Sequence, residues 1–176
     1  MTKRVILSPE QLKITLRRIA MELAEKHQDF SNCALIGLQP RGISFARKLK
    51  SILEEHHGIK DIKYGELDAT FYRDDFRRNE KILIPSPIEL DFSIVDLNVV
   101  LVDDVLFTGR SVRSALNALS DFGRPGNTEL CALIDRRFSR ELPIQPDYVG
   151  YDVDTRANDK VIVDIENEQK VWIITE

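Results

Sequence analysis

Apolar and amphipathic stretches alternate along this chain. Short apolar runs predict buried strands within residues 32–38, 99–102 and 129–135, and residues 62–72 contain a further strand. Longer stretches with apolar residues at every third or fourth position predict helices over 8–25, over 43–55 and from near 111 to 119. Weaker strand patterns lie at 4–7, 161–165 and 170–175, and the last two flank a predicted hairpin turn at 167–169.

Capping residues support the first two helices. Ser8 suits the N-cap of the first helix, with Pro9 in the first helical position and Gln11 three residues after the cap. Its apolar stripe consists of Leu12, Leu16, Ile19, Ala20 and Leu23. Gly58 is expected to close the second helix.

Strands that alternate with helices predict an α/β fold with a parallel sheet and right-handed crossovers. We expect residues 1–176 to form one domain with a five-stranded parallel core flanked by helices. An irregular section at 136–147, together with elements from the chain ends, is expected to form a small cap.

The stretch from Asn98 to Leu119 combines a strand, two acids and a helix start. Asp103 and Asp104 follow the apolar run directly, and Thr108-Gly109-Arg110-Ser111 leads into the helix. The apolar face of that helix is predicted at Val112, Ala115, Leu116 and Leu119. In an open α/β sheet this strand-to-helix turn is where ligands bind, and the free N–H groups of the helix start attract anions.

An anion site beside two carboxylates indicates a ligand with a phosphate and with sugar hydroxyls or a metal ion. Gly109 lets the backbone approach an anion closely, and Thr108 and Ser111 add hydroxyl donors. The alternative is that the acids only cap the helix and that Thr108-Gly109 is an ordinary turn. Neither a G-x-x-x-x-G-K-[ST] loop nor a G-x-G-x-x-G fingerprint is present here, which argues against those nucleotide sites.

Composition narrows the class of protein. A net charge of −4 gives no global attraction to nucleic acid, although a local basic face remains compatible with it. The sequence shows no apolar run of membrane-spanning length and no signal-peptide core, so we expect a cytoplasmic protein. Cys33 and Cys131 lie in apolar runs and are expected to be buried thiols. No Cys/His cluster has zinc-ligand spacing.

The run from Val99 to Ser111 resembles the loop that binds phosphoribosyl pyrophosphate in type I phosphoribosyltransferases. Its L-F-T-G-R version resembles most closely the PyrR family, bacterial pyrimidine regulators that are also uracil phosphoribosyltransferases. The resemblance implies that Asp103 and Asp104 hold the ribose hydroxyls and lie near Mg²⁺, as catalytic residues. It also implies that the 5′-phosphate is bound by the turn Val105, Leu106, Phe107, Thr108, Gly109, Arg110 and Ser111.

Two other segments resemble the substrate-binding parts of this family. Arg41-Gly42 is similar to the pyrophosphate loop, where Arg41 would stabilise the leaving group, although Gln39-Pro40 stands where the family commonly has Lys-Thr. Residues 67–76 are similar to the stretch that leads into a mobile loop over the site, and Arg73 there would reach the pyrophosphate. The alternative for this segment is an unremarkable solvated hairpin arm.

The run from Ile134 to Ile144 resembles the family's base pocket and cap. It implies substrate-binding roles for Asp135, Arg136 and Arg137, although a Gly-His pair is replaced and one residue is added across 137–139. By the same resemblance, the residue at position 107 indicates which base is bound. The related 6-oxopurine enzymes carry an aspartate there that handles a proton of the purine ring, whereas this chain has Phe107. Phenylalanine cannot do so, which favours a pyrimidine.

Three alternatives to a uracil enzyme remain open. The family resemblance implies binding to a messenger RNA leader, for which Arg17, Arg18, Arg136, Arg137 and Arg140 are candidates. However, Arg17 and Met21 replace a threonine and a histidine that the family associates with RNA. A phosphoribosyltransferase for another base, or an inactive binding domain, would also fit the altered 137–139 segment. By resemblance we expect a homodimer or a larger homo-oligomer.

Overall fold

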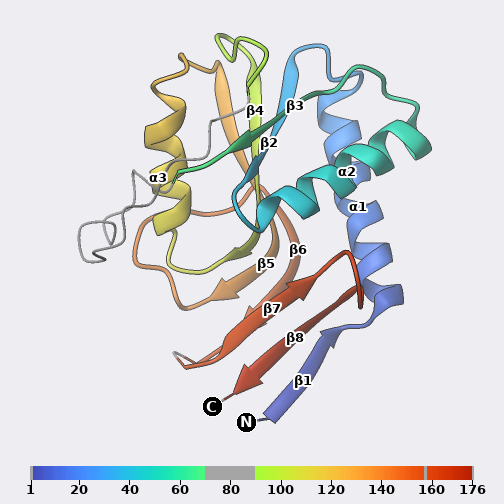
Figure 1. Cartoon of the computed structure of the whole chain (residues 1–176), viewed down its shortest axis with the longest axis vertical. Helices are drawn as coiled ribbons and strands as arrows, with labels where there is room; N and C mark the ends of the chain where they lie inside the picture. Colours follow the sequence, from blue (N-terminus) through green and yellow to red (C-terminus); the bar gives the residue numbers. More distant parts are fainter. Residues whose placement is uncertain (1, 70–89, 157, 176) are drawn as a thin grey trace.

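The computed structural model describes residues 2–69, 90–156 and 158–175, which form two sheets and three helices (Figure 1). The main sheet contains β2 (Cys33–Leu38), β3 (Lys63–Leu67), β4 (Asn98–Leu106), β5 (Asn127–Arg137) and β6 (Tyr148–Asp154). Its strands are all parallel in the order β3-β2-β4-β5-β6. The second sheet, which we call the hood, is antiparallel in the order β1-β8-β7. Its strands are β1 (Thr2–Leu7), β7 (Lys160–Asp164) and β8 (Lys170–Thr175).

The helices begin and end where the local chemistry predicts. In α1 (Pro9–His27), the Ser8 hydroxyl accepts a hydrogen bond from the Gln11 amide, and the Gln11 side chain accepts one from the Ser8 amide. This capping box satisfies amide groups that have no partner inside the helix. α2 (Gly42–His57) ends at Gly58, whose φ of 64° is a left-handed conformation that glycine adopts without strain.

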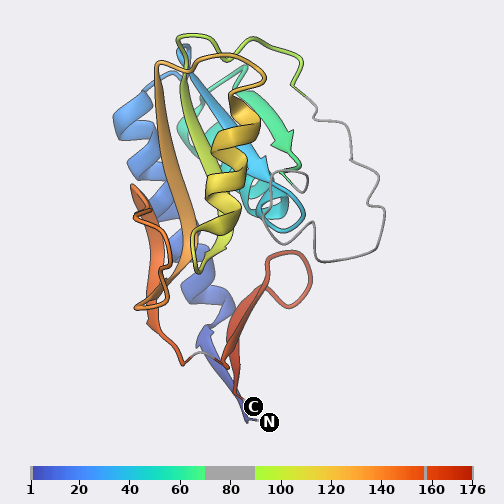
Figure 2. The same ribbon diagram turned by 90° about the vertical axis from the view of Figure 1, so that its left-hand side faces the viewer.

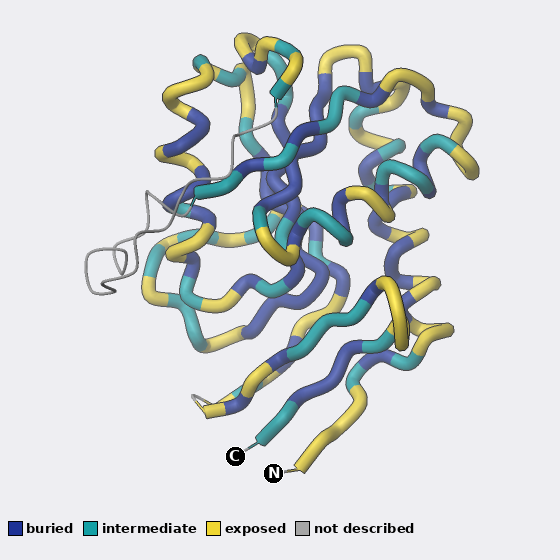
Figure 3. The backbone as a smooth tube through the Cα atoms, viewed as in Figure 1, coloured by how far each residue is buried: buried dark blue, intermediate teal, exposed yellow. Residues whose placement is uncertain are grey.

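The helices divide between the two faces of the main sheet. α1 and α2 cover one face, where their buried residues join Leu35, Val100 and Val102 in one core cluster. α3 (Arg110–Leu119) covers the other face and packs against Ile36 and Leu101. Figures 1 and 2 show α3 and α1 on opposite sides of the strands, and Figure 3 shows the central strands as the most deeply buried part of the backbone.

Three details of the predicted architecture are wrong. β4 runs on to Leu106 because it stays paired with β5 as far as Asp135, so both acids lie inside the strand and not after it. β6 was not predicted, because it is an edge strand that alternates irregularly between buried and exposed residues. Leu116 of α3 is 39% exposed and Ala118 is buried in its place.

The cap is also built differently from the prediction. The hood consists of the chain-end strands β1, β7 and β8. The turn that joins β7 to β8, at 165–169, includes the predicted hairpin turn at 167–169. The irregular section contributes no strand to it, and instead Glu141 and Leu142 donate backbone hydrogen bonds to the Thr108 carbonyl. The strands of the main sheet point their carboxyl ends toward the hood (Figure 1), which places a cleft between the two sheets.

Candidate active site

A cleft of about 480 Å³ lies between the carboxyl end of the main sheet and the hood. Three separate parts of the chain meet there, namely the end of β2 with its loop, the end of β4 with the start of α3, and the hood strand β7. The lining residues are Leu38, Gln39, Pro40, Arg41, Asp103, Asp104, Val105, Phe107, Ser111, Arg136, Lys160, Val161 and Ile162. Arg41 and six other predicted site residues therefore line one cavity.

The two acids of β4 form the centre of the cleft. Asp104 is only 6% exposed, and one of its carboxylate oxygens, Oδ1, accepts a hydrogen bond of 2.9 Å from the Val105 amide. The other oxygen, Oδ2, is buried and has no hydrogen-bond partner. A buried carboxylate oxygen without a donor is costly unless a ligand supplies one.

Burial raises the pKa of both acids. For Asp103 the neighbouring charge of Asp104 raises the pKa further, whereas the Arg41 guanidinium opposes the rise in both groups. The unliganded site therefore holds two carboxyl groups that a cation or hydroxyl donors would stabilise in their charged form.

Close backbone packing brings Arg41 to the acids. A side-chain carbon on Gly42 would lie 2.3 Å from the Val102 carbonyl oxygen, so only glycine lets the start of α2 press against β4. Arg41 occupies the N-cap position of α2, is exposed, and lines the cleft. The predicted pairing of Arg41-Gly42 with the acids at one sheet edge is thus present.

The turn into α3 has the form of an anion site. Gly109 has a φ of 90° and is the N-cap residue, and no side chain caps the helix. The Arg110 amide donates to the Thr108 hydroxyl at 3.3 Å. Amides at the start of a helix attract an anion, and Ser111, the next residue, lines the cleft. On its other side the turn is closed by Ile144, whose Cδ1 lies 3.2 Å from the position of an added Gly109 side-chain carbon.

Phe107 and Arg136 form a flat wall of the cleft. The Arg136 guanidinium carbon lies 3.9 Å from the centre of the Phe107 ring, a cation–π contact. Arg136 is 6% exposed and donates to the Thr155 hydroxyl at 2.9 Å and to the Arg156 carbonyl at 3.2 Å. Its burial lowers the pKa of the guanidinium. A flat base can lie against such a surface.

Several predicted site residues lie outside the cleft lining. Leu106 is buried in the core beside α3, and Gly42 and Gly109 act through the backbone contacts above. Asp135 pairs with Arg140, Arg110 pairs with Glu141, and Arg137 pairs with Asp154 at 2.8 Å on the surface. Thr108 takes part through its carbonyl, which accepts from the 141–142 backbone. Arg73 lies outside the described residues.

Three hood residues in the cleft, Lys160, Val161 and Ile162, were not predicted as site residues. They belong to β7, an edge strand of the hood that begins about 50 residues after the turn into α3. Their sequence predicts only a short strand, so nothing local distinguishes them from other strand residues. The fold alone brings them opposite Asp103 and Asp104.

The donor set of the cleft fits Mg²⁺. Within the described ranges, no group of three or more His, Cys, Asp or Glu side chains could hold a metal ion. Mg²⁺ commonly keeps water and substrate oxygens and takes only one or two protein carboxylates. Asp103 and Asp104, with the unpartnered Oδ2 of Asp104, match that requirement.

No helix in the described part of the chain is long and apolar enough to cross a membrane.

Comparison with known proteins identifies the family. The phosphoribosyl transferase domain model matches residues 6–169. A bifunctional protein PyrR from Elusimicrobium minutum is 43% identical over 164 residues, which cover 93% of this chain and 90% of the relative. Bifunctional protein PyrR from Bacillus subtilis is 40% identical over 167 residues, with 93% and 91% covered. This chain belongs to the PyrR family.

Solved structures place this chain in the type I phosphoribosyltransferase fold. A hypoxanthine-guanine phosphoribosyltransferase from Bacillus anthracis matches with a TM-score of 0.74 and 19% identity, covering 98% of both chains. The corresponding enzyme from Leishmania tarentolae, in complex with GMP, matches with a TM-score of 0.73 and 15% identity, covering 97% and 95%. At these identities the likeness establishes the fold and leaves the base open.

Proposed function

We propose that this chain is a uracil phosphoribosyltransferase, which converts uracil and phosphoribosyl pyrophosphate to UMP and pyrophosphate. One observation carries the proposal: the buried, unpartnered Oδ2 of Asp104 lies in the same cleft as Arg41 and the uncapped start of α3. A ligand with hydroxyls beside one phosphate and a pyrophosphate at the other end fits these three features together.

Each feature has a role in this reaction. The turn from Val105 to Ser111 binds the 5′-phosphate, because the helix start offers backbone amides and a positive dipole end. Asp103 and Asp104 accept hydrogen bonds from the ribose 2′- and 3′-hydroxyls. As a uracil ring nitrogen displaces pyrophosphate, positive charge builds on the ribose, as in glycoside cleavage. The protein then acts mainly by positioning and electrostatics.

Arg41 stabilises the departing pyrophosphate, since a guanidinium binds phosphate oxygens in a fork. Asp103 and Asp104 are the residues that would hold Mg²⁺, and the bound ion supplies charge neutralisation for the pyrophosphate oxygens. Arg73 is a further candidate for the pyrophosphate, on the resemblance stated above.

The base lies between the Phe107–Arg136 wall and β7. Because β7 is an edge strand of the hood, one row of its N–H and C=O groups has no partner strand within the described ranges. Uracil presents alternating acceptors and a donor along one edge, which an edge strand can bind through its backbone. Phe107 cannot handle a purine ring proton, and this also supports a pyrimidine.

A panel assay tests the proposed base. The purified chain is supplied with phosphoribosyl pyrophosphate, Mg²⁺ and one of uracil, orotate, hypoxanthine, guanine or xanthine. We expect turnover with uracil and with none of the purines. Turnover with a purine and none with uracil would overturn the assignment.

The alternative role, binding to a messenger RNA leader, receives less support from the surface. RNA binding needs basic side chains that are available to phosphates and exposed bases. Of the five candidate arginines, Arg136 and Arg140 are mostly buried and bond within the chain. Arg18 and Arg137 also bond to other parts of the chain, although about half of each side chain is exposed. A gel-shift against the leader of the chain's own pyrimidine operon, with and without UMP, separates the two roles. The absence of a shift would remove the regulatory role.

A further inference from the structure

The segment at 140–144 is attached to the anion-binding turn through side chains and backbone together. The Arg140 guanidinium donates to the Phe107 carbonyl with one nitrogen and to the Asp135 carboxylate with another. The amides of Glu141 and Leu142 donate to the Thr108 carbonyl at 3.0 and 3.3 Å. None of these segment residues lines the cleft, so they act on the turn from its far side.

Two further contacts complete the attachment. The Glu141 carboxylate accepts a hydrogen bond of 2.6 Å from the Arg110 guanidinium, in the first turn of α3. Ile144 packs against Gly109. Four consecutive residues of the turn, 107–110, are thus each held by the same short segment.

The geometry of these bonds fixes the direction of the turn's amides. In a trans peptide the carbonyl and the following N–H point in opposite directions, and the peptides after Phe107 and Thr108 are both trans. Because the Phe107 and Thr108 carbonyls point toward the 140–144 segment, the N–H groups of Thr108 and Gly109 point away from it. Those amides are therefore aimed before any ligand binds.

Arg140 is the anchor of this arrangement. Its side chain is 21% exposed and bridges the turn to Asp135, which is 12% exposed and lies on β5 opposite the last residue of β4. A planar guanidinium can satisfy two acceptors in fixed directions at once, which a lysine ammonium on a flexible stem does less well. Arg140 is also one of the candidate RNA contacts, and its guanidinium is engaged in these two bonds.

We propose that Arg140 and Glu141 are positioning residues that hold the 107–110 turn in its phosphate-binding conformation. Neither touches the substrate, and both act through the direction of backbone amides. The nature of the ligand rests on the proposed function, whereas the effect on the turn does not.

Hydrogen exchange measured by mass spectrometry tests the effect on the turn in the ligand-free protein. We expect Arg140→Met to increase deuterium uptake in a peptide covering 105–112, with Arg140→Lys restoring part of the protection. Arg47→Met is the matched control, since it removes the same charge from an exposed pair with Glu66, away from the turn. Uptake in Arg140→Met equal to that of the wild type would overturn the proposal.

Calorimetric titration with ribose 5-phosphate tests the consequence for binding. Loss of the Arg140 bridge should weaken binding by about tenfold or more, and Glu141→Gln should weaken it less. In the uracil assay the KM for phosphoribosyl pyrophosphate should rise more than kcat falls, because the turn binds the phosphate of both substrate and product.

The variants distinguish a failure of the positioning role from a failure of the proposed function. If Arg140→Met does not fold, Glu141→Gln decides, and unchanged exchange and binding in that variant would refute the positioning role. A wild-type chain that binds no ribose 5-phosphate would instead refute the proposed function, and the exchange measurement would still decide whether the segment holds the turn.

Discussion

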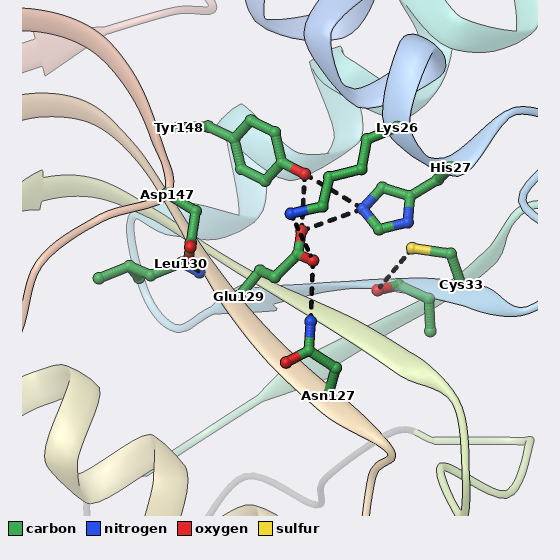
Figure 4. Close-up of polar contacts among 9 residues, drawn as sticks. Lys26, His27, Cys33, Asn127, Glu129, Leu130, Asp147 and Tyr148 are labelled. Carbon is green, nitrogen blue, oxygen red and sulfur yellow. Dashed lines mark hydrogen bonds and ion pairs between the residues drawn. The ribbon is translucent and has the colours of Figure 1, made fainter.

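Two buried acidic sites lie at opposite ends of the main sheet and are built in opposite ways. At the amino end, the Glu129 carboxylate accepts from Asn127 and Lys26 on one oxygen, both at 2.9 Å. Its other oxygen accepts from the Tyr148 hydroxyl at 2.6 Å and lies 3.0 Å from His27 Nε2 (Figure 4). At the carboxyl end, Asp104 Oδ2 has no partner.

The pKa values of the two sites move in opposite directions. Burial alone would raise the pKa of Glu129, but hydrogen bonds from Tyr148, Lys26 and His27 together hold it below the ordinary value. At Asp103 and Asp104, burial prevails and the pKa is raised. A buried carboxylate with all its donors in place stabilises the fold, whereas one that lacks a donor is typical of a functional site.

The largest expected effect is on turnover at the unsatisfied site. Asp104→Asn should lower uracil turnover by about 10²-fold or more, because it removes the charge that in the proposed reaction binds the ribose hydroxyls and Mg²⁺. Arg41→Ala should act in the same direction through the pyrophosphate. Both variants should stay folded, and circular dichroism checks this. Near-normal turnover of the folded variants would contradict the assigned roles.

The matching change at the amino end of the sheet, at Glu129, should lower stability and leave turnover unchanged. Glu129→Gln leaves buried donors mismatched and should lower the free energy of unfolding by about 1–3 kcal/mol, measured by urea denaturation. Turnover at a temperature where the variant is folded should equal that of the wild type. A stable but inactive variant would mean that the two sites are not separate in function.

The pH dependence of stability should have opposite signs at the two sites. Because the pKa of Glu129 is lowered from 4.5, its contribution is present above about pH 4.5 and is lost as the pH falls through the folded value. Asp103 and Asp104 have raised pKa values, so their contribution is greatest at low pH and falls as the pH rises above 3.8.

Urea denaturation at a series of pH values below and above 3.8 and 4.5, in buffer with a chelator, measures the contributions of Glu129 and of the two aspartates to stability. The stability difference between wild type and Glu129→Gln should shrink toward acid pH, whereas Asp103→Asn should gain on the wild type as the pH rises. Parallel curves for all three proteins would contradict the comparison.

The smallest effect is expected from a single donor of the satisfied site. Tyr148→Phe keeps the ring, removes the hydroxyl bonded to Glu129, and should cost about 1 kcal/mol of unfolding free energy. Because Glu129 then keeps three donors, the acid-side loss of stability should begin at a higher pH than in the wild type. An unchanged acid midpoint would show that the hydroxyl does not hold the pKa down.

Much of the fold could be read from local patterns. The Ser8 capping box, the stop at Gly58 and the buried β2, β4 and β5 cores follow from residue types and spacing, because each depends on contacts within a few residues. The turn at 108–111 that leads from the strand of Asp103 and Asp104 into α3 was equally local. β6 escaped prediction because its burial is set by α1 and β5 and leaves no regular alternation in the sequence.

What the sequence by itself determined is the set of residues offered to the site: two adjacent acids near the carboxyl end of β4, the Thr108–Ser111 turn after it, and the Arg41-Gly42 loop after β2. Only the tertiary structure decided which oxygen is left without a donor, that β7 lines the cleft, and that the Arg140 guanidinium bonds to the Phe107 carbonyl. The physical reason is distance along the chain. Hydrogen-bond satisfaction and burial depend on partners dozens of residues away, and those partners meet only when the sheets assemble.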